Sequence, residues 1–495
     1  MIKINGRPSA TGFHPSLFLT RKILYVNLKA RRWCKLYGCQ QHLIQEAPEI
    51  MAILEYICLE ANRLTNCGIY YCRQMLFKAG IFLTRGALDR ELKSNIHFKA
   101  MRSACAQQTL HGVIESFNSY KALLKLYKEE KLHFRPKPPS YRKKGGMAVV
   151  SYPSRWVKLI DGSVGMRSLG ETHPQPLQGG EDSPWSHRYL KFPLGNQVKA
   201  WFGIDHFLLP MPSNLDYKSI KQYRILPRNG CFYIEFVYQQ PEIEPIEANN
   251  NVLGIDPGLN NWITGVSNTG KSFIIDGKKV KSQNQWYNKQ VAKIKRGKPQ
   301  DYWDEELAEL TEKRNRQMRD NINKAARLII NWCLANNVSN IVFGWNQFNK
   351  DGINIGKKNN QEFVQIPTAK LKERVSQLGQ QYGINFIDTE ESYTSQASFL
   401  DDDFLPKYGE KPERWEASGR RVERGLYCSS NGSLINADCN GAANIIKKVR
   451  TQLNLDLTKV CRGVLTLPKR YFLDSLSKKY CKHSERVETA LGISA

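Results

Sequence analysis

Residues 252–276 contain three short apolar runs separated by glycine-containing bends, and this pattern constrains the fold more than any other in the chain. The runs are Val252 to Asp256, Trp262 to Val266 and Lys271 to Asp276. Short apolar segments bounded by Gly and Asn are typical of consecutive antiparallel strands. The sequence therefore predicts a three-stranded meander that opens a domain. The acidic, proline-containing stretch at 241–250 is predicted to be the linker before it.

The residues after the meander alternate between helical and strand patterns. An apolar stripe predicts a long helix over 302–336, followed by a strand at Ser339 to Phe343, a helix at 368–382 and a strand at Gly383 to Asp388. A strand–helix–strand succession implies parallel pairing. The predicted class is therefore α/β, with a domain of the RNase H-like kind and a further helix over 436–449.

The N-terminal half combines helical and strand-like blocks. The run Ile23 to Val26 predicts a strand, residues 47–129 predict packed helices, and 147–240 predict short antiparallel strands in a sheet or barrel. We expect the first strand and the later sheet to form one lobe, into which the helices are inserted. The basic, turn-rich stretch RPKPPSYRKKGG at 135–146 is predicted to be a charged linker. The basic segment 451–495 shows no clear pattern.

Charge points to a polyanionic partner. The chain has 73 Lys and Arg against 46 Asp and Glu, a formal net charge of +27, which favours nucleic acid. It has neither an apolar run of about 18 residues nor the apolar core of a signal peptide, so we expect a cytoplasmic protein without membrane contact. The 12 cysteines include no C-x-x-C pair and are predicted to be reduced thiols.

Two aspartates stand where a metal-dependent nuclease would need them. Asp256 ends an apolar strand before Pro257, and Asp438 precedes a helical run rich in Ala and Gly, which would let that helix approach the sheet. Cleavage of a phosphodiester by two metal ions needs converging carboxylates, and Mg²⁺ prefers oxygen ligands. Two alternatives remain open: Asp256 as a turn residue and Asp438 as a helix cap.

Several motifs together resemble a known family. GIDPG at 254–258, the basic helix leading into NIVFG at 340–344, ESYTSQASF at 391–399 and NADCNGAANI at 436–445 look like the RuvC-domain signatures of transposon-encoded TnpB proteins. The basic linker is similar to the family's junction between recognition and wedge regions. The similarity spans roughly residues 20–450.

The resemblance implies an RNA-guided DNA endonuclease that cuts next to a short flanking motif. Its expected ligands are two Mg²⁺ ions, a guide RNA and double-stranded target DNA. The expected architecture is an RNase H-like (RuvC) nuclease domain plus a β-barrel wedge domain with an inserted helical recognition domain. The expected domain bounds are 1–44 and 130–246 for the wedge, 45–129 for recognition, 247–450 for the nuclease with a degenerate insert at about 395–434, and 451–495 for a basic tail.

This sequence departs from the family pattern at two places. The family's second catalytic residue is a Glu at the end of the strand that here reads NIVFG, but Trp345 and Asn346 follow it. The neighbouring strand ends in Glu390 and Glu391, and only one of the two can face the site because side chains alternate. We predict Glu391, with Glu390 as the alternative. Only Cys428 stands where the family carries paired cysteines, so no zinc is predicted.

The predicted catalytic and metal-binding set is thus Asp256, Glu391 and Asp438. Loss of the usual Glu leaves open a nuclease-inactive, guided DNA-binding protein, and a compact type V CRISPR effector is a further alternative. The cluster Asp401 to Asp403 is predicted to be a solvated loop. The oligomeric state is left open. The predicted nucleic-acid contacts are basic residues and one aromatic: Arg135, Lys137, Tyr141, Arg142, Lys143, Lys144, Arg314, Arg316, Arg319, Arg327, Arg420 and Arg421.

Overall fold

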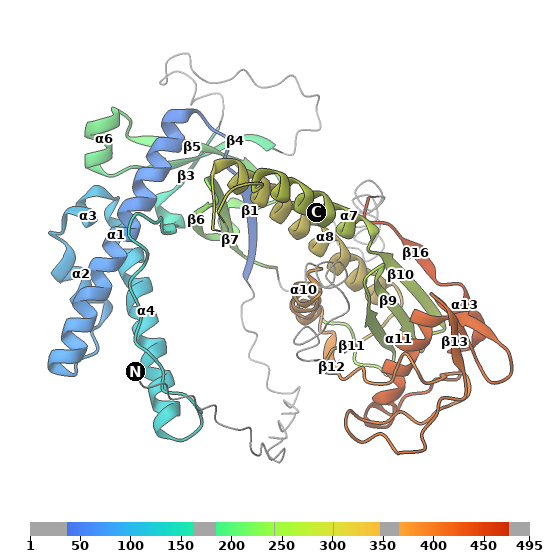
Figure 1. Cartoon of the computed structure of the whole chain (residues 1–495). Coiled ribbons are helices and arrows are strands. Elements are labelled where there is room, and N and C mark those ends of the chain that lie inside the picture. Colours follow the sequence, from blue (N-terminus) through green and yellow to red (C-terminus); the bar gives the residue numbers. More distant parts are fainter. Residues whose placement is uncertain (1–36, 162–184, 242, 300, 347–365, 475–495) are drawn as a thin grey trace, which may run out of the picture. The chain divides into compact units, whose positions relative to one another are not determined.

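A computed structural model describes residues 37–161, 185–241, 243–299, 301–346 and 366–474 (Figure 1). The strand predicted at Ile23 to Val26 lies outside the described residues. Within them, no helix is both long and apolar enough to cross a membrane.

The helical block predicted at 47–129 is confirmed as four helices. α1 starts with a proline, which suits a first helical turn, and ends at Gly80, whose φ of 69° is the left-handed conformation that glycine adopts at helix ends. The side chain of Thr84 caps α2. The helices are α1 (Pro48–Ala79), α2 (Arg85–Leu92), α3 (Ile96–Ala100) and α4 (Ser103–Lys128).

Seven strands form two antiparallel sheets, and both sheets share a hydrophobic core with the four helices. One has the order β1-β7-β6-β2 and the other β3-β4-β5. A 3-10 turn at Ser154–Trp156 separates β2 from β3, so the described strands make two sheets rather than one continuous barrel wall. The strands are β1 (Tyr37–Leu43), β2 (Val150–Pro153), β3 (Lys158–Asp161), β4 (Trp185–Pro193), β5 (His206–Pro212), β6 (Ile220–Arg228) and β7 (Cys231–Gln239), with helix α6 (Asn196–Phe202) between β4 and β5.

The helical block is an insertion in the first sheet. β1 pairs with β7 from Tyr37 opposite Gln239 to Leu43 opposite Tyr233, while all four helices lie between β1 and β2 in the chain. Apolar residues of helices and sheets share one core. Its aromatic centre includes Phe192 and Phe207, whose rings stack at 4.9 Å. A helical insertion in an antiparallel sheet agrees with the sequence prediction, but the strand before the insertion is β1 (Tyr37–Leu43), whereas the strand predicted at Ile23 to Val26 lies outside the described residues.

A six-stranded mixed sheet follows, with the order β12-β11-β8-β9-β10-β16. Strands β8, β9 and β10 form the predicted antiparallel meander, and β11 and β12 add in parallel beside β8, also as predicted. The strands are β8 (Val252–Pro257), β9 (Asn261–Ser267), β10 (Lys271–Asp276), β11 (Asn340–Gly344), β12 (Asn385–Thr389) and β16 (Lys469–Tyr471). β16 pairs in parallel with β10, so part of the segment predicted to be a basic tail is an edge strand of this sheet.

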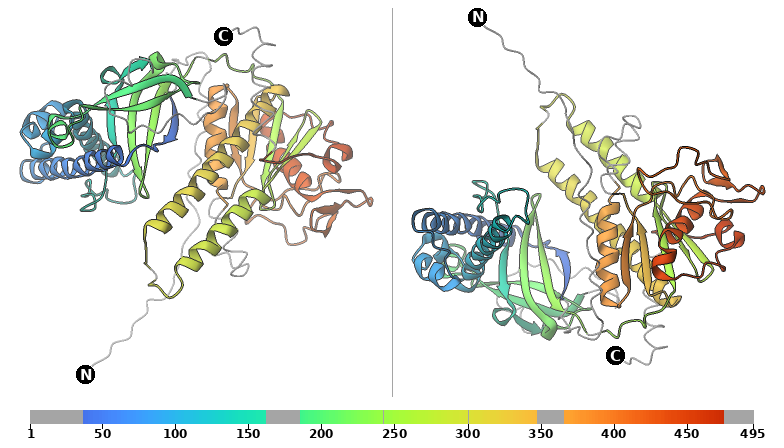
Figure 2. Two further views of the ribbon diagram at one scale, coloured as in Figure 1. Left: turned by 90° about the horizontal axis from the view of Figure 1, so that it is seen from above. Right: turned by 90° about the horizontal axis from the view of Figure 1, so that it is seen from below.

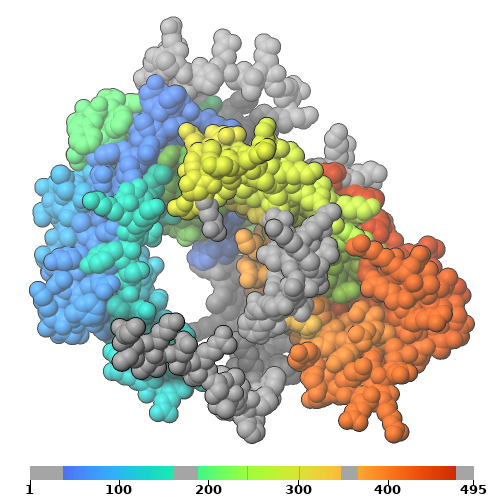
Figure 3. Space-filling view, viewed as in Figure 1, coloured from blue at the N-terminus to red at the C-terminus, as the bar shows by residue number. Residues whose placement is uncertain are grey.

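Helices cover both faces of the sheet. The face carrying Leu253 and Ile255 packs against α8 (Glu305–Ala335) and α10 (Thr368–Gln381). The face carrying Val252 and Val266 packs against α11 (Ala437–Lys448), on the opposite side in both views of Figure 2. Helix α7 (Lys278–Ile294), which the sequence did not predict, packs beside α8, and both form an exposed surface in yellow-green tones in Figure 3. Two short helices, α12 (Arg450–Leu453) and α13 (Arg462–Thr466), follow α11.

A small insert between β12 and α11 is held together by carboxylates. It contains the three-stranded sheet of β13 (Arg420–Glu423), β14 (Leu426–Cys428) and β15 (Leu434–Asn436). Asp403 accepts hydrogen bonds from the backbone N–H groups of Ser398 (2.6 Å) and Ser418 (3.0 Å), and Asp401 accepts one from that of Ser430 (2.9 Å). The solvated loop predicted for these aspartates is wrong for Asp403, which is 8% exposed, because its carboxylate serves as an internal cross-link.

Candidate active site

Asp256 is positioned by the alternation of β8. Leu253 and Ile255 face α8 and α10, so Gly254 and Asp256 face α11. Gly254 allows the close approach, since a Cβ there would lie 2.6 Å from the carbonyl oxygen of Ala442 on α11. The following bend is bridged by the Gly258 N–H, which donates to the Trp262 carbonyl at 3.1 Å. Within the described residues no hydrogen bond ties the Asp256 carboxylate to that bend, so the structure does not use it as a turn cap.

Asp438 lies in the first turn of α11 but does not cap it. The cap is Asn436, whose side chain accepts from the N–H groups of Asp438 and Cys439, each at 3.0 Å. Asp438 Oδ2 accepts a hydrogen bond from Asn261 Nδ2 at 2.6 Å, and its Oδ1 lies 3.6 Å from Arg421 Nη2. The Asp438 side chain is 30% exposed, so its carboxylate can be reached from solvent.

The two glutamates after β12 have different surroundings. Glu390 is paired with Lys448 and accepts from the Tyr408 N–H at 3.2 Å. Burial alone would raise the pKa of Glu390, but hydrogen bonds from Lys448 and Ser392 hold it below its ordinary value. Glu391 has its backbone N–H bonded to Asn346 Oδ1 at 3.0 Å. Glu390 thus serves an internal ion pair with α11, whereas Glu391 lies close enough to Asp256 for their charges to interact.

Electrostatics link the three predicted acids. The pKa of Asp256 is raised well above its ordinary value, first by desolvation of the half-buried carboxylate and then by the negative charges of Glu391 and Asp438, with Arg421 opposing. The backbone of α11 contributes to this proximity, because a Cβ at Gly441 would lie 2.8 Å from Asp256 Oδ2. The structure therefore brings Asp256, Glu391 and Asp438 into one neighbourhood. In the described parts of the chain, no three His, Cys, Asp or Glu side chains are already arranged to hold a metal ion.

The end of β11, where the family's Glu would stand, is tightly packed against α11. Gly344 pairs with Thr389 of β12 and faces α11, where a Cβ would lie 2.5 Å from Ile445 Cδ1. A longer side chain at 344 would force Ile445 or the whole helix away from the sheet. Glu391 stands two residues beyond the end of β12, the strand next to β11.

The donor set suits a hard divalent cation. Three carboxylates supply only oxygen ligands, which suit Mg²⁺ better than zinc, whose structural sites use Cys and His. The hydroxyl of Thr264, directly opposite Asp256 in the β8–β9 register, is buried and has no hydrogen-bond partner among the residues that the structure describes. An acid with a raised pKa beside two further acids is a site where a cation would relieve repulsion.

The predicted basic linker lies along α1 rather than hanging free. Asn66 bonds both backbone groups of Arg142, donating to its carbonyl at 3.2 Å and accepting from its N–H at 2.8 Å. Asn62 donates to the Lys143 carbonyl at 3.0 Å, and Arg73 to that of Pro139 at 3.0 Å. The backbone is thus held while the side chains of the predicted contacts in this segment stay exposed, namely Arg135, Lys137, Tyr141, Arg142, Lys143 and Lys144.

The predicted contacts on α8 are mostly engaged within the protein. Arg314 donates to Asn284 of α7 at 2.9 Å, and burial lowers its pKa. Arg319 pairs with the buried Glu312 at 2.8 Å on the same helix. The exposed Arg327 donates to the Tyr382 hydroxyl at 2.9 Å. Phosphate contacts by these three residues and by the half-buried Arg316 stay predictions, but the first two already have structural roles.

The predicted contacts Arg420 and Arg421 lie on β13 and are both exposed. Arg421 is the one near the carboxylates, because its guanidinium faces Asp438.

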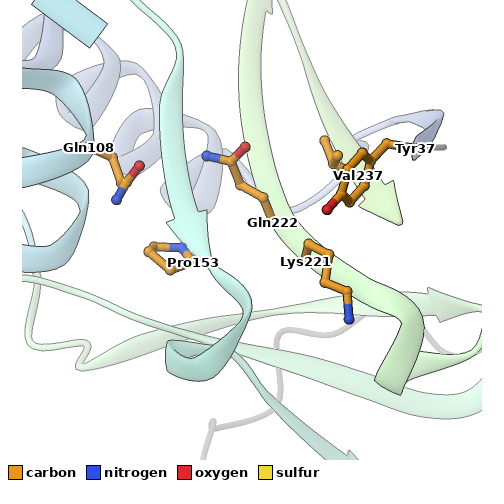
Figure 4. Close-up of a pocket in the computed structure, with 6 residues that line it drawn as sticks. All are labelled: Tyr37, Gln108, Pro153, Lys221, Gln222 and Val237. Carbon is orange, nitrogen blue, oxygen red and sulfur yellow. The ribbon is translucent and has the colours of Figure 1, made fainter. Parts of the chain in front are cut away.

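One hollow of the described chain lies among residues other than these acids. It has a volume of about 420 Å³ and is formed on the sheet of β1, β2, β6 and β7 (Figure 4). Lys221 is the single titratable side chain other than Tyr37 in its lining, so this hollow lacks the groups that hydrolysis needs. Its lining residues are Tyr37, Gln108, Pro153, Lys221, Gln222 and Val237.

Comparison with known proteins confirms the resemblance to the TnpB family. Residues 235–347 match the family OrfB_IS605, described as a probable transposase. No curated protein is significantly similar in sequence.

Several solved structures share a distant likeness. A Cas12f1–sgRNA–target DNA complex is 14% identical, with 83% of this chain and 98% of that chain covered at a TM-score of 0.29. A CRISPR–Cas12f ternary complex is 14% identical, with 81% and 82% covered at a TM-score of 0.28. The mini-RNA-guided endonuclease CRISPR-Cas_phi3 is 11% identical, with 83% and 92% covered at a TM-score of 0.41.

Proposed function

We propose that this chain is an RNA-guided DNA endonuclease whose RNase H-like (RuvC) domain cuts target DNA at Asp256, Glu391 and Asp438. The observation that carries the proposal is the placement of Asp256 at the end of β8 against α11, which carries Asp438, with Glu391 near enough to help raise the pKa of Asp256. Repulsion among clustered carboxylates lowers the stability of the fold, so such clusters are typical of sites that bind cations or catalyse reactions. The TnpB family resemblance supports the reaction class.

Two Mg²⁺ ions are the proposed cofactor, held by the same three carboxylates. When bound, they would activate water and stabilise the leaving oxygen of the phosphodiester. The chain's own residues position the acids: β8 presents Asp256, the Asn436 cap leaves the Asp438 carboxylate unused by the helix end, and Asn346 fixes the backbone of Glu391. Arg421, beside Asp438, is suited to meet a phosphate of the DNA backbone.

The proposed partners are a guide RNA and double-stranded target DNA. The net charge of +27 supports a polyanion of considerable length. The exposed basic residues of segment 135–144 are carried on a backbone that α1 holds in place, as expected of a surface that binds phosphates.

The test is cleavage by the full chain purified with its co-expressed RNA. Wild type with Mg²⁺ should cut a matched DNA target, and Asp256→Ala should abolish cutting while retaining target binding. Glu413→Ala, which changes an exposed acid in the insert, serves as the matched control and should cut normally. Cutting by the Asp256→Ala protein at the wild-type rate would refute the assignment.

One observation favours a second function, that of a guided DNA-binding protein without nuclease activity. Gly344 and Trp345 occupy the end of β11, where the family's Glu would stand, and Ile445 closes the space above Gly344. If the wild-type complex binds matched DNA with Mg²⁺ or Mn²⁺ present but leaves it intact, this second function is the correct one.

A further inference from the structure

A chain of polar contacts reaches Asp438 from the C-terminal strand β16. Arg470 Nη1 donates to Asn261 Oδ1 at 2.9 Å, and Asn261 Nδ2 donates to Asp438 Oδ2 at 2.6 Å. The same Arg470 nitrogen lies 3.0 Å from Oδ2 of Asp276, whose side chain is 5% exposed. These residues belong to β16, the start of β9, α11 and β10, so the series of contacts connects four elements.

The donors and acceptors in this series of hydrogen bonds can be assigned in only one way. A guanidinium can only donate, so Arg470 requires the oxygen of the Asn261 amide to face it. The amide nitrogen must then face Asp438, whose carboxylate can only accept. Arg470 thereby fixes the orientation of Asn261, an orientation that an isolated Asn would not hold.

Asp276, at the far end of this series of contacts, is buried, and both of its carboxylate oxygens accept hydrogen bonds. Asp276 Oδ1 accepts from the Lys278 N–H at 2.8 Å, and Oδ2 accepts from Arg470. The parallel pairing of β16 with β10 sets Arg470 opposite Ile274, two residues before Asp276 on the same face of β10. Alternation sends the neighbouring Lys469 and Tyr471 to the other face, where Tyr471 packs against the core shared with α8 and α10.

We infer that Asn261 and Arg470 are positioning residues that hold Asp438 for cation binding, so that the C-terminal strand is part of the active site. This inference rests on the proposed function. By hydrogen bonding to Oδ2, Asn261 restricts the rotation of the carboxylate, so that Oδ1, which lies 3.6 Å from Arg421 Nη2, is the oxygen that a cation would reach. Groups that orient a metal ligand in this way typically change metal affinity by about 10- to 100-fold when removed.

The test is Mn²⁺ binding to the full chain without RNA, followed by electron paramagnetic resonance. Binding that disappears in Asp256→Ala defines the site. Asn261→Ala should weaken that binding by about 10- to 100-fold. Arg470→Ala should weaken it too, and the double variant should bind no more weakly than Asn261→Ala alone, because Arg470 acts through Asn261. Arg470→Lys, which keeps a cationic donor, should recover part of the loss.

Two controls separate positioning from folding. Lys469→Ala changes the adjacent residue of the same strand and should bind Mn²⁺ like wild type. Arg470→Ala strands the buried Asp276, so it is also made in an Asp276→Asn background, where no unpaired charge remains. Within that background, Arg470→Ala should still weaken Mn²⁺ binding at an unchanged melting temperature.

The outcomes distinguish the inference from the proposed function. Wild-type Mn²⁺ affinity in Asn261→Ala, together with loss in Asp256→Ala, overturns the inference and leaves the proposed function standing. Absence of Asp256-dependent Mn²⁺ binding in the wild-type chain overturns both.

Discussion

Gly441 of α11 lies against the carboxylate of Asp256, so closely that a Cβ at 441 would be 2.8 Å from Oδ2. The carboxylate is the movable end of a side chain, so it and not the helix should yield to an added methyl group. We therefore predict that Gly441→Ala lowers the rate of DNA cleavage by about 10- to 100-fold with little change in melting temperature. Gly112→Ala is the matched control, since nothing lies within 4 Å of that helical position. Equal cleavage rates for the two variants would contradict the prediction.

Gly254 should behave differently from Gly441, because the atom it would meet is backbone. An added Cβ would lie 2.6 Å from the Ala442 carbonyl oxygen and 2.4 Å from Ile446 Cγ1. Gly254→Ala must push α11 away from the sheet, so we expect a loss of about 1–3 kcal/mol in the free energy of unfolding. Urea denaturation measures this loss, and an unchanged midpoint would show that α11 packs less tightly on β8 than described.

The two glutamates after β12 should give opposite results on substitution. Glu391→Gln should abolish cleavage and keep stability. Glu390→Gln should keep cleavage but lose about 1–2 kcal/mol, because Lys448, 7% exposed, loses its ionic partner while Glu390 itself is one-third exposed. Cleavage assays and thermal denaturation on both variants check this. Loss of cleavage in Glu390→Gln alone would transfer the catalytic role to that residue.

The raised pKa of Asp256 predicts how stability depends on pH in the metal-free protein. The folded state binds the Asp256 proton more tightly than the unfolded state, whose Asp pKa is about 3.9. This contribution is complete below the unfolded pKa and is lost as pH rises through the folded pKa. In a chelator, Asp256→Asn should therefore be more stable than wild type at neutral pH, with the difference shrinking towards pH 4. A constant difference across that range would refute it.

The insert between β12 and α11 should depend on Asp403 rather than on zinc. Asp403→Ala leaves the N–H groups of Ser398 and Ser418 without their acceptor, at a cost of about 1–3 kcal/mol each where they are buried. We expect rapid proteolytic cutting within 395–434 in this variant and none in Glu413→Ala. Adding a zinc chelator to wild type should leave the digestion pattern unchanged. Chelator-induced cutting would instead indicate a bound metal.

Five strands of the six-stranded sheet were predictable because their sequence pattern is local. Apolar runs with glycine at the bends revealed β8, β9 and β10, and strand–helix–strand spacing revealed the parallel pairing of β11 and β12. β16 gave no such signal. Its three residues are Lys, Arg and Tyr, and the strand exists because β10 offers a free edge beside it.

The site was only partly predictable. Asp256 and Asp438 stand at the end of a strand and the start of a helix, positions that sequence reveals. Asn261 and Arg470 could not be found, because an Asn in a turn and an Arg in a basic segment are both ordinary. Their significance arises from the fold, which sets them beside Asp438. Likewise, the Asp403 carboxylate is engaged by Ser418, 15 residues further along the chain, which no local pattern reveals.

The pairing of β1 with β7 has a consequence for synthesis of the chain. Tyr37 emerges from the ribosome long before its partner Gln239, and the four helices are made in between. Helices form from neighbouring residues and can pack early, whereas closure of a long loop delays the strand pairing. We expect β1 to stay an unpaired edge until β7 is complete, so translation pauses between these points would expose it to aggregation.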